Sequence, residues 1–114
     1  MPLEPESFTR RQRARYPFVA RAKAMDEASG MQLEGLTTHI SEGGCCIMTR
    51  RVLFSQGTPI LLEITKDGVS MRTHAFVAYN FKNQFMGLCF LRMPPSQETI
   101  LAGWLQAAMP SPSR

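Results

Sequence analysis

Six short stretches with strand-like patterning, each bounded by turn-forming residues, constrain the fold of this chain more than any other feature. They span residues 17–25, 31–41, 43–49, 59–65, 70–80 and 84–93. Several of them alternate polar and apolar residues, which indicates strands with one face in a core. Strands spaced this closely, without helical segments between them, pair in an antiparallel sheet. We therefore predict a mainly β chain, a six-stranded antiparallel β-barrel, because closure removes exposed sheet edges.

Two tight turns are predicted within the second half of the barrel. The sequences KDG (residues 66–68) and FKN (residues 81–83) separate the last three strand candidates. Gly68 and Asn83 can adopt the positive φ that such turns require. These strands are therefore expected to form consecutive hairpins.

The segment PPSQETILAGWLQAAM, residues 94–109, changes to helical spacing. We predict one C-terminal α-helix with Ser96 as its N-cap after the two prolines. Because an isolated helix this short would be marginal in water, it should pack on the barrel. Trp104 is the expected main anchor of an apolar face made of Ile100, Leu101, Trp104, Leu105 and Ala108. Residues 110–114 are expected to be a C-terminal tail.

The size and composition fit a single soluble domain. A chain of 114 residues, 44% hydrophobic, can form one core. No stretch approaches the ~18 to 20 apolar residues of a membrane span, so no membrane insertion is expected. Residues 1–9 carry two glutamates and two prolines where a secretory signal would be apolar, and we expect them to be a flexible arm. Three cysteines, two of them adjacent, cannot all pair, which favours reduced thiols and a cytoplasmic location.

The positive charge is concentrated at the front of the chain. Residues 1–23 contain six basic residues against Glu4 and Glu6, whereas the remaining seven basic and seven acidic residues cancel. Arginines bind phosphates in a bidentate manner and stack on bases, so an anionic ligand is expected here. A solvated basic segment is the simpler alternative. The six basic residues are Arg10, Arg11, Arg13, Arg15, Arg21 and Lys23.

A second feature lies at the junction of the second and third strand candidates. Residues 39–44 read HISEGG, with Ser41 followed by Gly43 and Gly44. A serine hydroxyl and nearby backbone N–H groups at a tight bend can let an anion approach the main chain. By itself, a serine before two glycines is usually only a turn.

Together, the two features resemble the PilZ domain family, small bacterial domains that bind cyclic di-GMP. That family has an RxxxR motif before the first strand and a [D/N]xSxxG motif after the second. Arg11 and Arg15 match the first motif, with Arg10 ahead of them, and Ser41 and Gly44 match the second. The resemblance runs from about Arg10 to Met109, so we expect a PilZ-like domain over residues 10–109, with a barrel of the split-barrel type.

The resemblance implies a binding function. Arg11 and Arg15 would hold the phosphates and guanines of cyclic di-GMP with help from Arg10, while His39, Ser41, Gly43 and Gly44 would line the barrel side. Binding would order the arginine-rich arm, and an unidentified effector protein in motility, adhesion or surface-polysaccharide (biofilm) control would respond to this change. Such a domain is not an enzyme and needs no cofactor or metal.

His39 departs from the motif, which has Asp or Asn at this position. A carboxylate or amide can accept hydrogen bonds from a guanine edge, but a neutral imidazole has one acceptor nitrogen in a different plane. An unpaired buried guanine donor would cost about 1 to 3 kcal/mol, or roughly one to two decades of affinity. We therefore hypothesise a weakened or altered ligand site.

Two other functions stay open on the sequence. One is a degenerate PilZ-like adaptor that binds a protein, for example in a pilus or motility system, but little or no nucleotide. The other is a small nucleic-acid binder of OB-like type, which we regard as the weaker reading. Motifs such as GxSxG, HExxH or a Walker loop are absent, and His39 and His74 show no metal-ligand spacing. The aromatic residues Phe76, Tyr79, Phe81, Phe85 and Phe90 are expected in the core or rim of the barrel.

Overall fold

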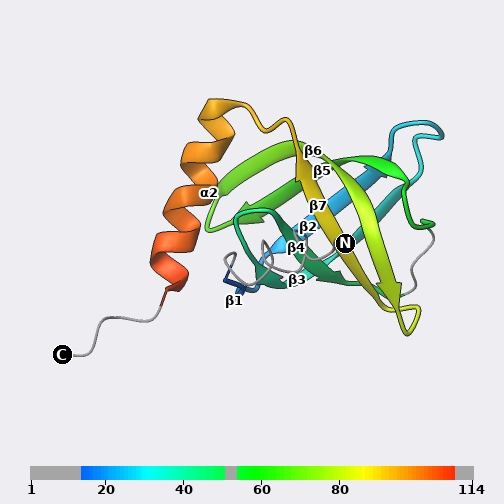
Figure 1. Cartoon of the computed structure of the whole chain (residues 1–114), viewed down its shortest axis with the longest axis horizontal. Helices are drawn as coiled ribbons and strands as arrows, with labels where there is room; N and C mark the ends of the chain where they lie inside the picture. The colour runs from blue at the N-terminus through cyan, green and yellow to red at the C-terminus, as the bar shows by residue number, and fades with distance from the viewer. Residues whose placement is uncertain (1–13, 51–53, 110–114) are drawn as a thin grey trace, which may run out of the picture.

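The computed structural model describes residues 14–50 and 54–109 (Figure 1). The predicted arm at residues 1–9, Arg10, Arg11, Arg13 and the tail at 110–114 lie outside these residues. The elements, in chain order, are β1 (Tyr16–Pro17), β2 (Arg21–Asp26), β3 (Gln32–Ile40), β4 (Gly44–Met48), β5 (Pro59–Lys66), β6 (Val69–Phe81), β7 (Phe85–Leu91) and α2 (Pro95–Ala108).

The strands form a closed antiparallel barrel. The sheet order is β1-β3-β2-β5-β6-β7-β4, and β3 also pairs with β4, which closes the ring of six long strands. This confirms the predicted mainly β fold with one C-terminal helix. The two-residue strand β1 adds to β3 outside the ring, pairing Tyr16 with Ile40 and Pro17 with His39, and was not predicted.

The first predicted strand, residues 17–25, is interrupted, which corrects its boundaries. β1 ends at Pro17 and β2 begins at Arg21. Between them the buried Thr37 hydroxyl donates to the Phe18 carbonyl (2.7 Å) and accepts from the Ala20 N–H (2.9 Å). This side chain satisfies backbone groups that the interrupted ladder with β3 leaves unpaired. β1 and β2 both pair with β3: β1 at His39 and Ile40, and β2 at residues 32–36.

Alternation along the strands fills the barrel interior. Residues of β5 alternate between the core and the outer face, and β6 does the same from Met71 to Val77. The largest fully buried side chains are Ile40, Ile60, Leu62, Ile64, Met71, Met86, Val77 and Thr37. β2 contributes small side chains, Ala22 and Ala24, to the same core. Burial of this apolar set supplies the main driving force for the fold.

The two predicted turns are present. Asp67 and Gly68 have φ of 52° and 82° between the paired residues Lys66 and Val69, as in a two-residue hairpin with both central residues left-handed. Lys82 and Asn83 have φ of 55° and 56° at the β6–β7 connection. Both hairpins are therefore confirmed.

Helix α2 lies along one side of the barrel (Figure 1) and contacts β6 and β1. Leu101 is buried, and Ile100, Trp104, Leu105 and Ala108 pack partly buried against the core, as predicted. The Trp104 ring lies 5.4 Å from that of Phe18. Ser96 is not the N-cap: Pro94 has that position with extended φ and ψ, so Ser96 already belongs to the first turn. In the described part of the chain, no helix is long and apolar enough to span a membrane.

Candidate functional site

One row of outward-facing residues crosses four strands of the barrel and joins β1 to β6. Pro17 pairs with His39, His39 with Cys46, Cys46 with Gly87, and Gly87 with Tyr79. Residues paired across antiparallel strands point to the same side of a sheet. His39 and Tyr79, 40 positions apart in sequence, therefore face solvent on one surface. We call His39, Cys46, Gly87 and Tyr79 the site row.

Arg15 lies over this surface. Partial burial raises the pKa of Tyr79, and the Cys46 thiol adds to the rise, whereas the nearby Arg15 guanidinium opposes it. Arg15 therefore stands close enough to the phenol to affect its ionisation, although its own side chain is exposed. A cation, a phenol and an imidazole thus share one face. Arg15, from the first sequence motif, thus lies on the same face as His39 of the second.

The ring of Tyr79 has room on this face because its partner has no side chain. A Cβ added to Gly87 would overlap the ring carbons of Tyr79. The ring therefore lies against the backbone of β7 and presents its other face outward. An aromatic plane beside a guanidinium can stack on a purine.

The bend after β3 is tight and internally hydrogen-bonded. The Ser41 N–H donates to the Gly44 carbonyl (2.9 Å), and the Ser41 hydroxyl donates to the same carbonyl (3.3 Å). The Gly43 N–H donates to the Ser41 hydroxyl oxygen (3.3 Å). Ser41 therefore shapes the bend and retains one lone pair for a ligand.

Gly44 allows β4 and β7 to approach closely. A Cβ at this position would overlap the Leu88 carbonyl oxygen. The neighbouring Gly43 carbonyl accepts from the Phe90 N–H (2.9 Å), which fixes the bend to β7. A larger residue at position 44 would therefore not allow β4 and β7 to keep this spacing.

The structure brings together five of the seven residues named from the sequence. Arg15, His39, Ser41, Gly43 and Gly44 lie on or beside the site row, because Ser41 follows His39 by two residues and Gly44 precedes Cys46 by two. Arg10 and Arg11 lie outside the described residues. The His39 ring is exposed, with Nδ1 3.2 Å from the Thr38 hydroxyl.

Tyr79 and Cys46 were not identified as site residues from the sequence. Tyr79 was expected in the core or rim of the barrel, but it is 41% exposed on the outer face. The register between Tyr79 and Gly87 depends on an irregularity between Val77 and Tyr79 that local alternation does not indicate. A glycine opposite an aromatic residue would have been the signal, but only a known register shows that the two are paired.

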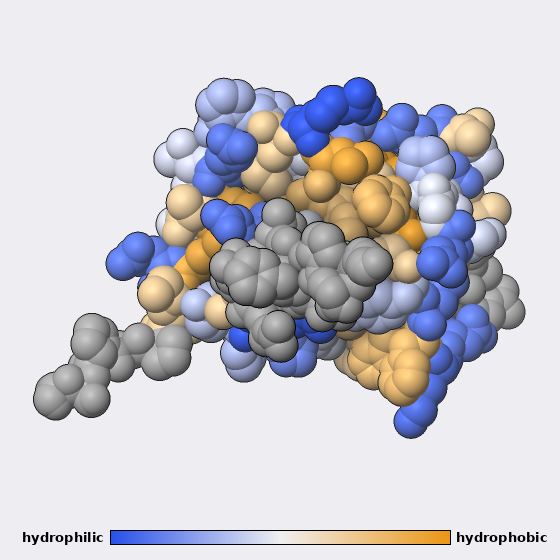
Figure 2. Space-filling view, in the orientation of Figure 1, coloured by the Kyte–Doolittle hydropathy of each residue, from blue (hydrophilic) through white to orange (hydrophobic). Residues whose placement is uncertain are grey.

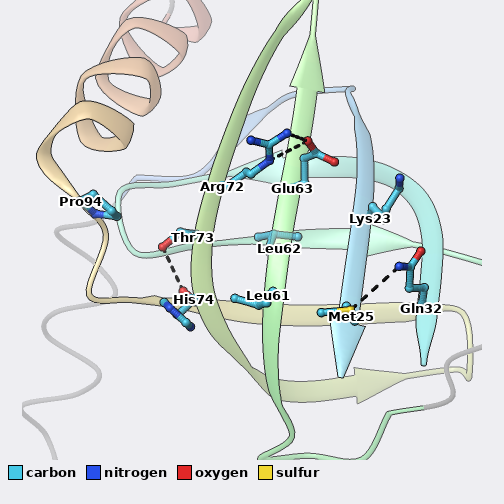
Figure 3. Close-up of a pocket in the computed structure, with 10 residues that line it drawn as sticks. All are labelled: Lys23, Met25, Gln32, Leu61, Leu62, Glu63, Arg72, Thr73, His74 and Pro94. Atoms are coloured by element: carbon cyan, nitrogen blue, oxygen red, sulfur yellow. Dashed lines mark hydrogen bonds and ion pairs between the residues drawn. The ribbon is translucent and has the colours of Figure 1, made fainter. Parts of the chain in front are cut away.

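A separate groove of about 340 Å³ lies on another part of the outer surface (Figure 3). Two of its polar side chains already have partners: Arg72 binds Glu63 (2.9 Å), and His74 binds Glu27 (2.9 Å). Apolar residues such as Met25 and Leu61 form much of its lining. No site residue predicted from the sequence lines this groove, so it is not the candidate site.

Within residues 14–50 and 54–109, no group of three or more His, Cys, Asp or Glu side chains could hold a metal ion. Cys45, Cys46 and Cys89 are free thiols. The candidate site therefore combines a guanidinium, an imidazole, a thiol and a phenol. These groups can bind phosphates and stack on bases.

Comparisons with solved structures agree on the fold. The PilZ domain of CeSA from a cellulose-synthesizing bacterium aligns at 17% identity with a TM-score of 0.67, covering 82% of this chain and 96% of that one. The PilZ domain with c-di-GMP of YcgR from Escherichia coli aligns at 15% identity with a TM-score of 0.65, covering 87% and 94%. The Bacillus subtilis inhibitor of motility, MotI/DgrA, aligns at 19% identity with a TM-score of 0.69, covering 84% of this chain and 49% of that one.

No curated protein sequence matches the chain. The family model described as PilZ domain, in contrast, matches residues 9–107, nearly the whole chain. The match includes both sequence motifs, all seven strands and most of the helix. This chain therefore belongs to the PilZ domain family.

Proposed function

We propose that this chain is a receptor domain for cyclic di-GMP that relays the level of this second messenger to a protein partner. The observation that carries the proposal is the position of Arg15 over the site row, beside Tyr79 and on the face that holds His39. The family supports it, since the PilZ domain of YcgR is described with c-di-GMP.

The ligand's chemistry matches these groups. Cyclic di-GMP carries two phosphates and two guanines, so its site needs cations for the phosphates and donors for the O6 and N7 atoms. The Arg15 guanidinium can supply both contacts, and the outward face of the Tyr79 ring can stack on a purine. The bend from Ser41 to Gly44 would border the ligand on the other side.

The proposed relay uses the arginine-rich arm. Arg10 and Arg11 would join Arg15 on the ligand, and the arm would become ordered over the barrel as they do so. An effector protein, for example one in motility or biofilm control, would respond to this ordered form. The module would act in the cytoplasm, bind its ligand without chemical change, and require neither a cofactor nor nucleic acid.

A second candidate function is an adaptor that binds a protein partner but little nucleotide. Two observations favour it. His39 stands where the family motif has Asp or Asn, and the proton of the Ser41 hydroxyl is directed to Gly44. Both reduce the hydrogen bonds that the barrel can offer to a guanine edge.

Isothermal titration separates the two functions. Cyclic di-GMP should bind the wild-type chain in preference to GTP and cyclic GMP, and Arg15→Ala should weaken binding by about tenfold or more. Arg72→Ala is the matched control, because Arg72 pairs with Glu63 away from the site and its loss should leave affinity unchanged. No binding by the wild type would support the adaptor. An equal loss of affinity in both variants would show that Arg15 is not a ligand-binding residue. Preferential, salt-sensitive binding of single-stranded DNA would indicate a nucleic-acid binder.

A further inference from the structure

A second row of outward-facing side chains runs beside the site row, and it is apolar. Leu36 pairs with Met48, Met48 with Phe85, and Phe85 with Phe81, so these residues cross β3, β4, β7 and β6 in order. Each lies two residues along its strand from a member of the site row, except on β3, where an irregularity separates Leu36 from His39 by three. We call Leu36, Met48, Phe81 and Phe85 the apolar row.

The apolar row is open to solvent. Phe81 is 54% exposed, Leu36 and Met48 are each 42% exposed, and Phe85 is half-buried. The Phe81 and Phe85 rings lie 6.2 Å apart. In Figure 2 the corner over the end of the β6–β7 hairpin, at the lower right, is orange with a blue tip. A contiguous exposed apolar surface on a soluble domain marks an interaction site.

Positive charge borders this row at both ends. Arg21 is paired with Leu36 at one end, and the Lys82 ammonium lies 5.3 Å from the centroid of the Phe81 ring at the other. Along one side runs the site row, which contains no acidic residue and has Arg15 over it. Glu34, two residues before Leu36, stands opposite Lys23. An occupant with apolar side chains flanked by carboxylates would complement this surface.

The spacing of the row suits a helix. Neighbouring strands lie ~4.8 Å apart, so four strands extend the row over roughly 14 Å. Successive anchors on one face of an α-helix recur about every 5.4 Å, which is close to this step. A helix lying across the strands can therefore place one apolar side chain against each member of the row over about three turns.

We propose that the apolar row is the docking site for an amphipathic helix of a partner protein, with Asp or Glu flanking its apolar face. The inference rests on the proposed function, in which a protein partner responds to the ligand-bound receptor. Because the apolar row and the site row are adjacent, a nucleotide on the site row would lie alongside the docked helix. Partner binding can thereby depend on the ligand without a rearrangement of the barrel.

Model peptides test the docking site on the full chain. The probe is a fluorescein-labelled amphipathic peptide of about 16 residues, with leucines on one face and glutamates on its flanks, that is marginally helical by itself and becomes helical when it binds. A matched peptide carries lysine at each glutamate position. Fluorescence anisotropy should show the glutamate peptide binding at least about tenfold more tightly than the lysine peptide, a difference of about 1.4 kcal/mol. Combined Arg21→Glu and Lys82→Glu substitutions should invert this preference.

Variants of the row complete the test. Met48→Ser and Phe81→Ser should each weaken binding of the glutamate peptide about tenfold, as for central interface residues. Val69→Ser, at a 45% exposed position at the other end of β6, should leave it unchanged. Circular dichroism and melting curves confirm that each variant folds. Equal binding of the two peptides, or an equal loss in Val69→Ser, would overturn the proposal.

Other occupants give distinct results. A dimer in sedimentation that Phe81→Ser abolishes would assign the row to a second copy of this chain and overturn the proposal. Co-sedimentation with vesicles of phosphatidylglycerol and phosphatidylcholine that the same variant abolishes would assign it to a membrane surface, with the same consequence. Titration of Met48→Ser and Phe81→Ser with cyclic di-GMP measures nucleotide binding independently of peptide binding, so the receptor function and the docking site are tested separately. A chain that binds the glutamate peptide through the row but no nucleotide retains this inference and loses the receptor function.

Discussion

The ring of Tyr79 on β6 covers Gly87 on β7 so closely that no Cβ fits beneath it. Gly87→Ala should therefore displace the ring from the site row or strain the β6–β7 pairing. We expect a loss of about 1 to 3 kcal/mol in the free energy of unfolding, as for other overpacked positions. Urea denaturation measures the loss.

The double variant Gly87→Ala with Tyr79→Ala is the control, because it removes the ring that the new methyl group meets. In the Tyr79→Ala background, Gly87→Ala should therefore cost much less free energy of unfolding than it does in the wild type. If Gly87→Ala costs as much free energy with Tyr79→Ala as without it, the close approach of these two residues is not the cause of the loss.

The cost of histidine at the motif position can be measured directly. His39→Asp should increase the affinity for cyclic di-GMP by about ten- to a hundredfold, since a carboxylate can accept two hydrogen bonds from a guanine edge at a gain of about 1 to 3 kcal/mol. His74→Asn, on a different part of the outer surface, is the control and should not change the affinity. A wild type that already binds tightly, with no gain in the aspartate variant, would show that His39 does not impair the site.

Thr37 stabilises the interruption between β1 and β2 through its side-chain hydroxyl. Its hydroxyl bridges the Phe18 carbonyl and the Ala20 N–H in a buried position. Thr37→Val keeps the shape of the side chain but leaves both backbone groups unpaired, so we expect a loss of about 1 to 3 kcal/mol. For a domain of this size, each kcal/mol corresponds to a fall of roughly 4 to 8 °C in Tm, which calorimetry can detect.

The control for this prediction is Thr65→Val. The Thr65 hydroxyl lies 2.8 Å from that of Ser70 near the barrel surface, where water can replace the lost partner. Its Tm should change little. A similar fall in Tm for both variants would indicate that the bridge to residues 18 and 20 has no special role.

The three thiols should differ in reactivity. Burial raises the pKa of Cys45 far above its usual range, and the neighbouring Cys46 and Cys89 thiols add to the rise. Because the thiolate is the reactive form, Cys45 should resist iodoacetamide at about pH 8 while Cys46, half-buried on the site row, is labelled. Mass spectrometry of the digested protein identifies the labelled residue, and rapid labelling of Cys45 in the folded chain would contradict the burial.

The same shift makes a stability prediction. A folded-state pKa above the unfolded value means that Cys45 favours folding while its thiol stays protonated in both states. That contribution should be lost as the pH rises above about 9.0, where the unfolded thiol ionises. Cys45→Ala should show a smaller fall in stability over this range.

The sequence by itself determined the six long strands, the two hairpins and the helix, but not β1 or the interruption at residues 18–20. Strand-like patterning and the turn residues Gly68 and Asn83 indicated these elements, because both are local properties of the chain. It also determined the apolar face of the helix through its spacing. The N-cap was misplaced at Ser96: the helix begins at Pro95, whose fixed φ suits the first helical position, and Pro94 is therefore the N-cap.

The tertiary structure decided which residues meet. Barrel closure pairs β3 with β4 and β4 with β7, and this register alone places His39, Cys46 and Tyr79 on one face with Arg15 above them. The interruption at residues 18–20 depends on Thr37, 17 positions away from Ala20. A local pattern carries no information on such pairings, because they arise from the way distant strands share one closed core. The site row and the apolar row therefore became visible only when the barrel was closed.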